Sequence, residues 1–181
     1  MIKLRQPALV LHSCDVKGYK FKMWTSWNMP ARARPRDVIY WILYARDQTP
    51  ELILHNVLIN THGAPGELYI GGKDVTEGLV DQTLNIHNVG IFSQLRGKDI
   101  GTIWLHGCNV AESPWGPHFC ASMAKESGCN VVAAESLQEI GRWDSYPFGC
   151  FDDYEGRTSC WDASGKRSVV FKNGAGAPGV A

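Results

Sequence analysis

A histidine and a cysteine stand at the ends of two apolar runs in this 181-residue chain. One run ends as Leu58-Ile59-Asn60-Thr61-His62-Gly63, and the other ends as Ile103-Trp104-Leu105-His106-Gly107-Cys108. A thiol is nucleophilic as the thiolate, and a neighbouring imidazole is the usual base that produces it. The pair therefore predicts a nucleophile, Cys108, with His62 as its general base.

Glycines flank both residues and add a second element of this chemistry. Gly63 places an unobstructed N–H beside His62, and Gly107 allows a sharp turn before Cys108. The N–H groups of Gly63 and Cys108 could together donate to a developing oxyanion. The predicted reaction is attack by the Cys108 thiolate on an amide or related acyl carbon.

Buried strands must position these residues. Residues 38–44, 52–60, 99–105 and 130–134 are continuous apolar runs, which is typical of strands covered on both faces. A short amphipathic helix is predicted over residues 88–95, and a longer one runs from Ser113-Pro114 to about Ser127, with Gly128 after its last turn. This order favours parallel β-α-β units, whose strands end at one edge of the sheet. His62 and Cys108 would then face each other across a crevice.

The predicted fold class is α/β, a three-layer α/β/α sandwich around a mostly parallel central sheet, with a C-terminal β-hairpin over residues 158–162 and 168–172. An irregular N-terminal segment, residues 1–36, packs on the domain and holds a short strand at 8–11. The α/β domain covers residues 37–172. Residues 173–181 consist mostly of Gly, Ala and Pro, which predicts a flexible tail.

The motifs resemble those of the caspase-like cysteine peptidases, a clan that includes caspases, legumain, clostripain and separase. The two site residues are 46 positions apart, close to the roughly fifty-residue caspase spacing. A bacterial caspase-like domain of poorly known function, found in large surface and adhesin-like proteins, is more similar still. Its pattern matches His62-Gly63-Ala64-Pro65-Gly66-Glu67-Leu68-Tyr69-Ile70-Gly71, Gly107-Cys108-Asn109-Val110-Ala111 and Val131-Val132-Ala133-Ala134. The resemblance covers about residues 38–145.

The resemblance implies a caspase-like fold and a cysteine endopeptidase, a thiol-protease hydrolase that acts on a peptide or protein substrate without a cofactor or metal. His62 would be the base, Cys108 the nucleophile, and Gly63 with Cys108 the oxyanion donors. The chain lacks the caspase signature Gln-Ala-Cys-x-Gly, so the aspartate specificity of caspases is not carried over.

Four further residues are candidates for substrate binding. Asn60 could orient His62, or satisfy a turn at the strand end. Glu135 and Ser136 follow the last buried run and either shape a substrate pocket or form an exposed loop. Asp144 could bind a basic side chain, or be a solvated loop acid.

Three alternatives compete with the peptidase. His62 could be a strand-end histidine in a turn and Cys108 a small buried thiol, although their joint position beside glycines favours a site. His62, His106 and Cys108 could instead ligate a metal, although Gly107 argues against a continued strand there. A third alternative is a non-catalytic module for recognition or assembly on the same scaffold.

Composition limits the partners. Eighteen Lys and Arg balance eighteen Asp and Glu, so the formal net charge is zero. Neutrality gives no electrostatic reason to expect nucleic acid or an anionic membrane, and the basic run 31–36 is interpreted as a solvated linker. No signal peptide or membrane-spanning run is visible, so we expect a soluble cytoplasmic protein, or export by a route that needs no N-terminal signal. The six cysteines are expected to be reduced, with Cys150 and Cys160 as an open disulfide alternative.

Overall fold

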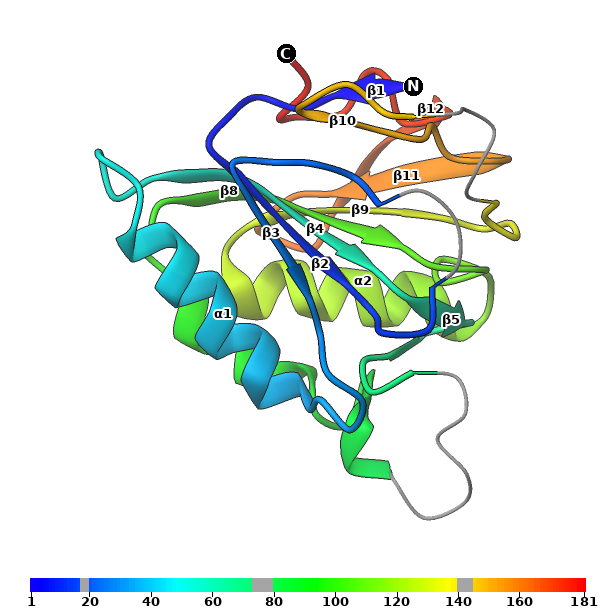
Figure 1. Cartoon of the computed structure of the whole chain (residues 1–181). Helices are drawn as coiled ribbons and strands as arrows, with labels where there is room; N and C mark the ends of the chain where they lie inside the picture. The colour runs from blue at the N-terminus through cyan, green and yellow to red at the C-terminus, as the bar shows by residue number, and fades with distance from the viewer. Residues whose placement is uncertain (17–19, 73–79, 140–144) are drawn as a thin grey trace.

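A seven-stranded sheet forms the centre of the protein, and most of its strands are parallel (Figure 1). The computed structural model describes residues 1–16, 20–72, 80–139 and 145–181. The strands, in spatial order, are β12 (Arg167–Lys172), β11 (Arg157–Trp161), β9 (Asn130–Ala134), β8 (Ile100–His106), β4 (Leu54–Asn60), β2 (Ala8–His12) and β3 (Thr25–Asn28). From β9 to β3 every neighbouring pair is parallel, whereas β11 pairs antiparallel with β9 and β12 pairs antiparallel with β11. The expected α/β class with a mostly parallel sheet is confirmed.

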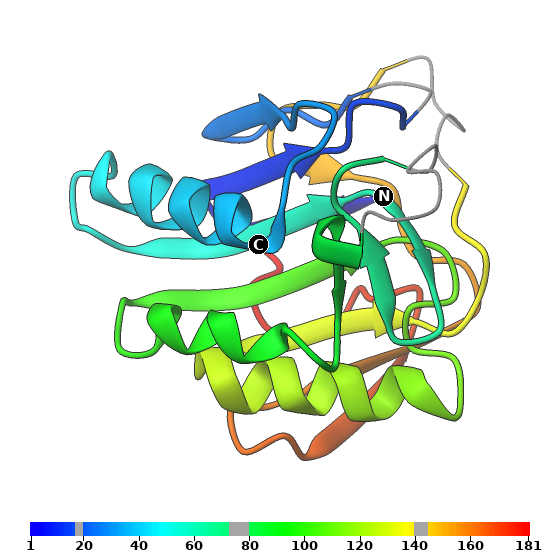
Figure 2. The ribbon, with the colours of Figure 1, turned by 90° about the horizontal axis from the view of Figure 1, so that it is seen from below.

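Both described α-helices cover the same face of this sheet (Figure 1). They are α1 (Pro35–Asp47) and α2 (Trp115–Ser127), and the 3-10 helix η2 (Val89–Leu95) contacts both of them (Figure 2). We expected helices on both faces. In the described residues the second face is instead covered by the terminal segments and by a two-stranded sheet of β1 (Ile2–Lys3) and β10 (Cys150–Phe151). No helix in these ranges has the length and apolar character to span a membrane.

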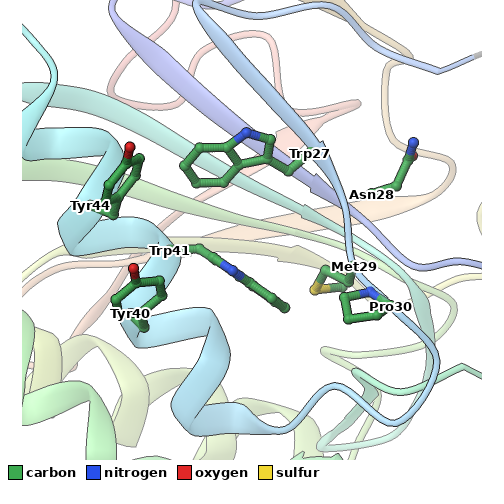
Figure 3. Close-up of a pocket in the computed structure, with 7 residues that line it drawn as sticks. All are labelled: Trp27, Asn28, Met29, Pro30, Tyr40, Trp41 and Tyr44. Carbon is green, nitrogen blue, oxygen red and sulfur yellow. The ribbon is translucent and has the colours of Figure 1, made fainter.

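The run Val38–Tyr44, expected to be a strand, lies inside α1. Pro35 occupies the first turn, where its missing N–H costs nothing, and the Asp37 carboxylate accepts the Arg34 N–H at 2.8 Å. These start signals outweigh the β propensity of the run. The helix buries Val38, Ile39 and Ile42 and exposes Tyr40 and Tyr44 (Figure 3). Residues 38–44 are therefore apolar on the exposed side of the helix as well as on the buried side.

The second helix and the strands around it agree with the sequence analysis. Gly128 ends α2 with a φ of 72°, and its N–H donates to the Ala124 carbonyl at 2.9 Å. This left-handed position is the usual place for glycine at a helix end. The short helix expected at 88–95 is present as η2, with Val89, Phe92 and Leu95 buried against the core.

Segments expected outside the domain are part of its core. β2 lies between β3 and β4, so the expected irregular segment 1–36 supplies two strands of the central sheet, which does not begin at residue 37, and β1 of the two-stranded sheet. The segment 173–181, expected to be a flexible tail, packs on the second face. The Asn56 amide donates to the Gly179 carbonyl at 2.9 Å, and the Thr102 hydroxyl donates to the Pro178 carbonyl at 2.9 Å. Buried polar side chains on the sheet hold this tail, and its composition alone does not reveal them.

A small three-stranded sheet extends from the carboxyl end of β4. It contains β5 (His62–Ala64), β6 (Glu67–Tyr69) and β7 (Thr83–Asn85), and the 3-10 turn η1 (Val80–Gln82) precedes β7. His62 pairs with Tyr69 and Gly63 with Leu68. The segment after β4 therefore leaves the main sheet as a separate ribbon that begins at His62.

Candidate active site

His62 and Cys108 follow equivalent positions on neighbouring strands. Asn60 of β4 pairs with His106 of β8 in parallel register, and each site residue comes two positions later. The Thr61 N–H donates to the His106 carbonyl at 3.1 Å, so the two segments stay hydrogen-bonded beyond the last paired residues of β4 and β8. Neighbouring parallel strands thus deliver both motifs to the same edge of the sheet.

The glycine of each motif lies in close contact with the segment that carries the other motif. A Cβ atom at Gly63 would lie 3.1 Å from the Cys108 carbonyl oxygen and 2.8 Å from Cγ2 of Val110. A Cβ atom at Gly107 would lie 3.0 Å from the Thr61 carbonyl oxygen. Only residues without a side chain allow the backbones to approach this closely. The glycines therefore bring the two motifs together.

His62 contacts a carboxylate that the sequence analysis did not identify. Its Nε2 lies 3.5 Å from Oδ2 of Asp15, and both side chains are partly exposed. Asp15 lies in the loop after β2, where Oδ1 accepts the Ser13 hydroxyl at 2.6 Å. The sequence signal was available as Ser13-Cys14-Asp15 after an apolar run. Without β2 placed beside β4, nothing connects that signal to His62.

The Cys108 thiol contacts the backbone of Gln138. The Gln138 N–H donates to Sγ at 3.4 Å, and Sγ lies 3.6 Å from the Gln138 carbonyl oxygen. The N–H of Cys108 itself donates to no acceptor in the part of the chain that the structure describes. The unpaired N–H of Cys108 is able to bind an oxyanion.

The other cysteines are less suited to nucleophilic attack. All six are free. Burial raises the pKa of Cys129 and of Cys160 to about 11, and it raises the pKa of Cys120 further. Raised pKa values keep these thiols protonated near neutrality. Cys14 is exposed and Cys108 is partly exposed, so accessibility separates these two from the buried thiols.

Asn60 does not orient His62. It is buried on the second face of the sheet between two buried histidines, which the register places beside it on β2 and β8. Its Nδ2 lies 2.8 Å from Nδ1 of His12, and its Oδ1 lies 3.2 Å from Nδ1 of His106. His12, Asn60 and His106 form a row of hydrogen-bonded side chains, which we call the polar row. Both ends of the Asn60 amide make hydrogen bonds within this row, so the predicted role of Asn60 in substrate binding or positioning is corrected.

The hydrogen bonds of the row define the proton positions on both rings. An amide that donates to Nδ1 of His12 leaves the proton on Nε2, which donates to the Phe21 carbonyl at 3.1 Å. Nδ1 of His106 donates to Asn60, and its Nε2 has no partner among the described residues. Burial lowers the pKa of both histidines to about 4, with a smaller repulsion between them at His106. Both rings are neutral at physiological pH.

The remaining predicted substrate residues lie in the segment after β9. The Glu135 carboxylate accepts a hydrogen bond of 2.6 Å from the Arg167 guanidinium. It is therefore paired with a cation on β12. The Ser136 carbonyl accepts the Asn109 N–H at 2.9 Å. The backbone of this segment therefore contacts the residue after Cys108, and a substrate-binding role for Glu135 and Ser136 stays a prediction. Asp144 lies outside the described residues.

Two other features bear on what the site could bind. Among the described residues, no group of three or more His, Cys, Asp or Glu side chains could hold a metal ion. A pocket of about 310 Å³ lies beside the turn between β5 and β6, and it is lined in part by Glu67, His87, Trp115 and His118. The sequence analysis did not single out this pocket.

Comparison with known proteins gives one finding. A family described as "Domain of unknown function (DUF4347)" matches residues 33–144, more than half of the chain, including both site motifs. No curated protein and no solved structure matches the chain significantly. The chain belongs to this family of domains of unknown function.

Proposed function

We propose that this protein is a cysteine hydrolase of caspase-like type, which cleaves a peptide or related acyl bond with Cys108 as nucleophile and His62 as base. The observation that carries the proposal is the close approach of the two motifs. A Cβ built on Gly63, the residue after His62, would lie 3.1 Å from the carbonyl oxygen of Cys108. Two reactive side chains adjacent to such a contact can share a substrate carbonyl.

The environment of His62 supports its role as base. A carboxylate beside one ring nitrogen favours a proton on that nitrogen and leaves the other as the acceptor. Asp15 lies beside Nε2, so Nδ1 is the nitrogen that would take the proton of the Cys108 thiol. The Ser13 hydroxyl, itself buried, restrains the Asp15 carboxylate. Asp15 is thus a positioning residue in this proposal.

The reaction follows from these groups. The Cys108 sulfur attacks the carbonyl carbon, and the N–H groups of Cys108 and Gly63 donate to the oxyanion. His62 gives its proton to the leaving amine as the C–N bond breaks, which leaves a thioester on Cys108. His62 then takes a proton from water, the hydroxide displaces the sulfur, and the acid product leaves.

The fold supports the same proposal at a coarser level. Residues of the site lie at the carboxyl ends of parallel strands, where α/β proteins bind their ligands. The antiparallel strands β11 and β12, read as a C-terminal hairpin, complete the sheet beyond β9. The caspase-like part of the proposal therefore rests on the parallel sheet and the two motifs, and not on helices on both faces of the sheet.

A labelling experiment tests the proposal without knowledge of the substrate. A mixture of peptide acyloxymethyl ketones, which react with activated cysteines, is incubated with the protein, and adducts are located by mass spectrometry. We expect the adduct on Cys108, with little on the exposed Cys14. Labelling should be lost in Cys108→Ala and strongly reduced in His62→Ala.

The matched control is His55→Ala, which removes a partly buried histidine at the other end of β4. It should label as the wild type does. Equal labelling of Cys14 and Cys108, or labelling that does not depend on His62, would overturn the proposal.

A further inference from the structure

One backbone residue, Gln138, contacts the Cys108 thiol as both donor and acceptor. The Gln138 N–H donates to Sγ at 3.4 Å, and the thiol donates to the Gln138 carbonyl oxygen at 3.6 Å. Among the hydrogen bonds of the described residues, none joins Sγ to His62, whose Nε2 lies beside Asp15. The thiol proton that His62 takes in the proposed reaction is therefore directed to a different acceptor in this structure.

The segment 135–139 follows β9 and includes this acceptor, and we call it the strap. The Ser136 carbonyl accepts the Asn109 N–H at 2.9 Å, so the strap crosses the chain beside Cys108. The one apolar side chain of the strap, Leu137, is 65% exposed. Hydrophobic burial therefore contributes little to the position of the strap, and polar contacts must hold it.

The side-chain amide of Gln138 supplies most of these contacts. Its Nε2 donates to the Ser136 carbonyl at 2.8 Å and to the Glu155 carbonyl at 3.3 Å, and its Oε1 accepts the Glu155 N–H at 3.2 Å. The Glu139 N–H donates to the Glu155 carboxylate at 3.3 Å. Each of these bonds contributes little net free energy, because water replaces it when the strap opens. We therefore expect the strap to open locally while the core stays folded.

We propose that the strap inhibits the candidate site in the resting protein, and that Cys108 becomes reactive when Gln138 leaves it. With the strap closed, the Gln138 backbone occupies the side of the sulfur to which the thiol proton points. When the strap opens, the thiol loses both contacts and is free to turn toward His62. This regulation rests on the proposed function of His62, but the covering of Cys108 by the strap can be measured without it.

The rate at which iodoacetamide alkylates Cys108 at pH 7, followed by mass spectrometry, measures how often the sulfur is uncovered. Gln138→Ala removes the amide that holds the strap, so Cys108 should react about 10-fold faster, or more, than in the wild type. Leu137→Ala is the matched control, because it shortens an exposed side chain of the same strap, and it should leave the rate unchanged. The exposed Cys14 should react equally in all three proteins. A Cys108 rate in Gln138→Ala at or below the wild-type rate would overturn the proposal.

A measurement on the wild type decides the question if Gln138→Ala does not fold, which reaction of the buried Cys120 and Cys129 would reveal. Exchange of the Gln138 N–H with deuterium is followed by NMR before and after alkylation of Cys108. We expect exchange about 10-fold faster, or more, in the alkylated protein, because the modified sulfur displaces the strap. Unchanged exchange would show that Cys108 reacts with the strap in place, and it would overturn the proposal.

Failure of this proposal and failure of the proposed function give different results. If the strap covers Cys108 but His62 is not its base, Gln138→Ala accelerates alkylation and His62→Ala changes nothing, alone or combined with Gln138→Ala. If His62 is the base and the strap does not inhibit, His62→Ala slows alkylation and Gln138→Ala has no effect. Both proposals together predict that the double variant reacts more slowly than Gln138→Ala alone.

Discussion

The two buried histidines, His12 and His106, predict a loss of stability in mild acid. Burial lowers the pKa of each to about 4 in the folded protein, whereas an unfolded histidine titrates near its ordinary value of about 6.5. The unfolded chain therefore binds more protons as the pH falls below that value. The contribution of these two histidines to the free energy of unfolding is therefore present above about pH 6.5 and is lost progressively as the pH falls to about 4.

The size of the effect follows from these pKa values. Between pH 7.5 and pH 5.5 each histidine lowers the free energy of unfolding by about 1.4 kcal/mol, or about 3 kcal/mol for both. The ordinary pKa values of Asp and Glu, about 4, lie below this range, so we expect the two histidines to dominate the loss. With a typical urea dependence, the midpoint of unfolding should fall by about 1 to 2 M.

Urea unfolding followed by tryptophan fluorescence at the two pH values measures this loss. His106→Gln removes one of the two titrating rings, so its loss between pH 7.5 and 5.5 should be about half that of the wild type. The variant is also expected to be less stable at pH 7.5, but the comparison is between pH values within one protein. His87→Gln, at an exposed position, should keep the full loss. A His106→Gln protein that loses as much stability as the wild type would refute the reasoning.

Two further predictions concern the candidate site. Asp15→Asn should slow alkylation of Cys108 by iodoacetamide about 10-fold or more at pH 7, because an amide can donate to Nε2 of His62 and favour the wrong tautomer; an unchanged rate would contradict the role of Asp15. Gly63→Ala should lower the free energy of unfolding by about 1–3 kcal/mol, measured by urea unfolding, because its Cβ would lie 2.8 Å from a side-chain carbon. Gly90→Ala, where a Cβ meets nothing within 4 Å, is the matched control, and an equal effect in both would show that the contact at Gly63 is not required.

The strands that carry the motifs could be predicted because their apolar runs are continuous. β4 and β9 lie within the runs that the sequence indicates, β8 extends one residue beyond its run, and α2 has clear end signals. The helix α1 was misread for a specific reason. Its exposed face carries Tyr40 and Tyr44 in place of charged residues, so the run appears apolar on every side.

Contacts between distant segments could not be predicted in the same way. Asp15 and Gln138 contact His62 and Cys108 only because β2 lies beside β4 and the segment after β9 reaches β8. Neither pairing has a local signal. The assignment of Asn60 failed for the same reason, since its partners come from strands that are distant in the sequence.

The polar row explains why the site residues arrive together. His12, Asn60 and His106 are the last residues of three neighbouring strands, joined in register and by hydrogen bonds. Asp15 follows the first by three positions, and His62 and Cys108 follow the other two by two positions each. Hydrophobic residues would pack there without fixing how the strands align, because apolar contacts are not directional. A side-chain hydrogen bond at each step is directional, so it favours one alignment of the strand ends and, through it, one arrangement of the loops that carry the site.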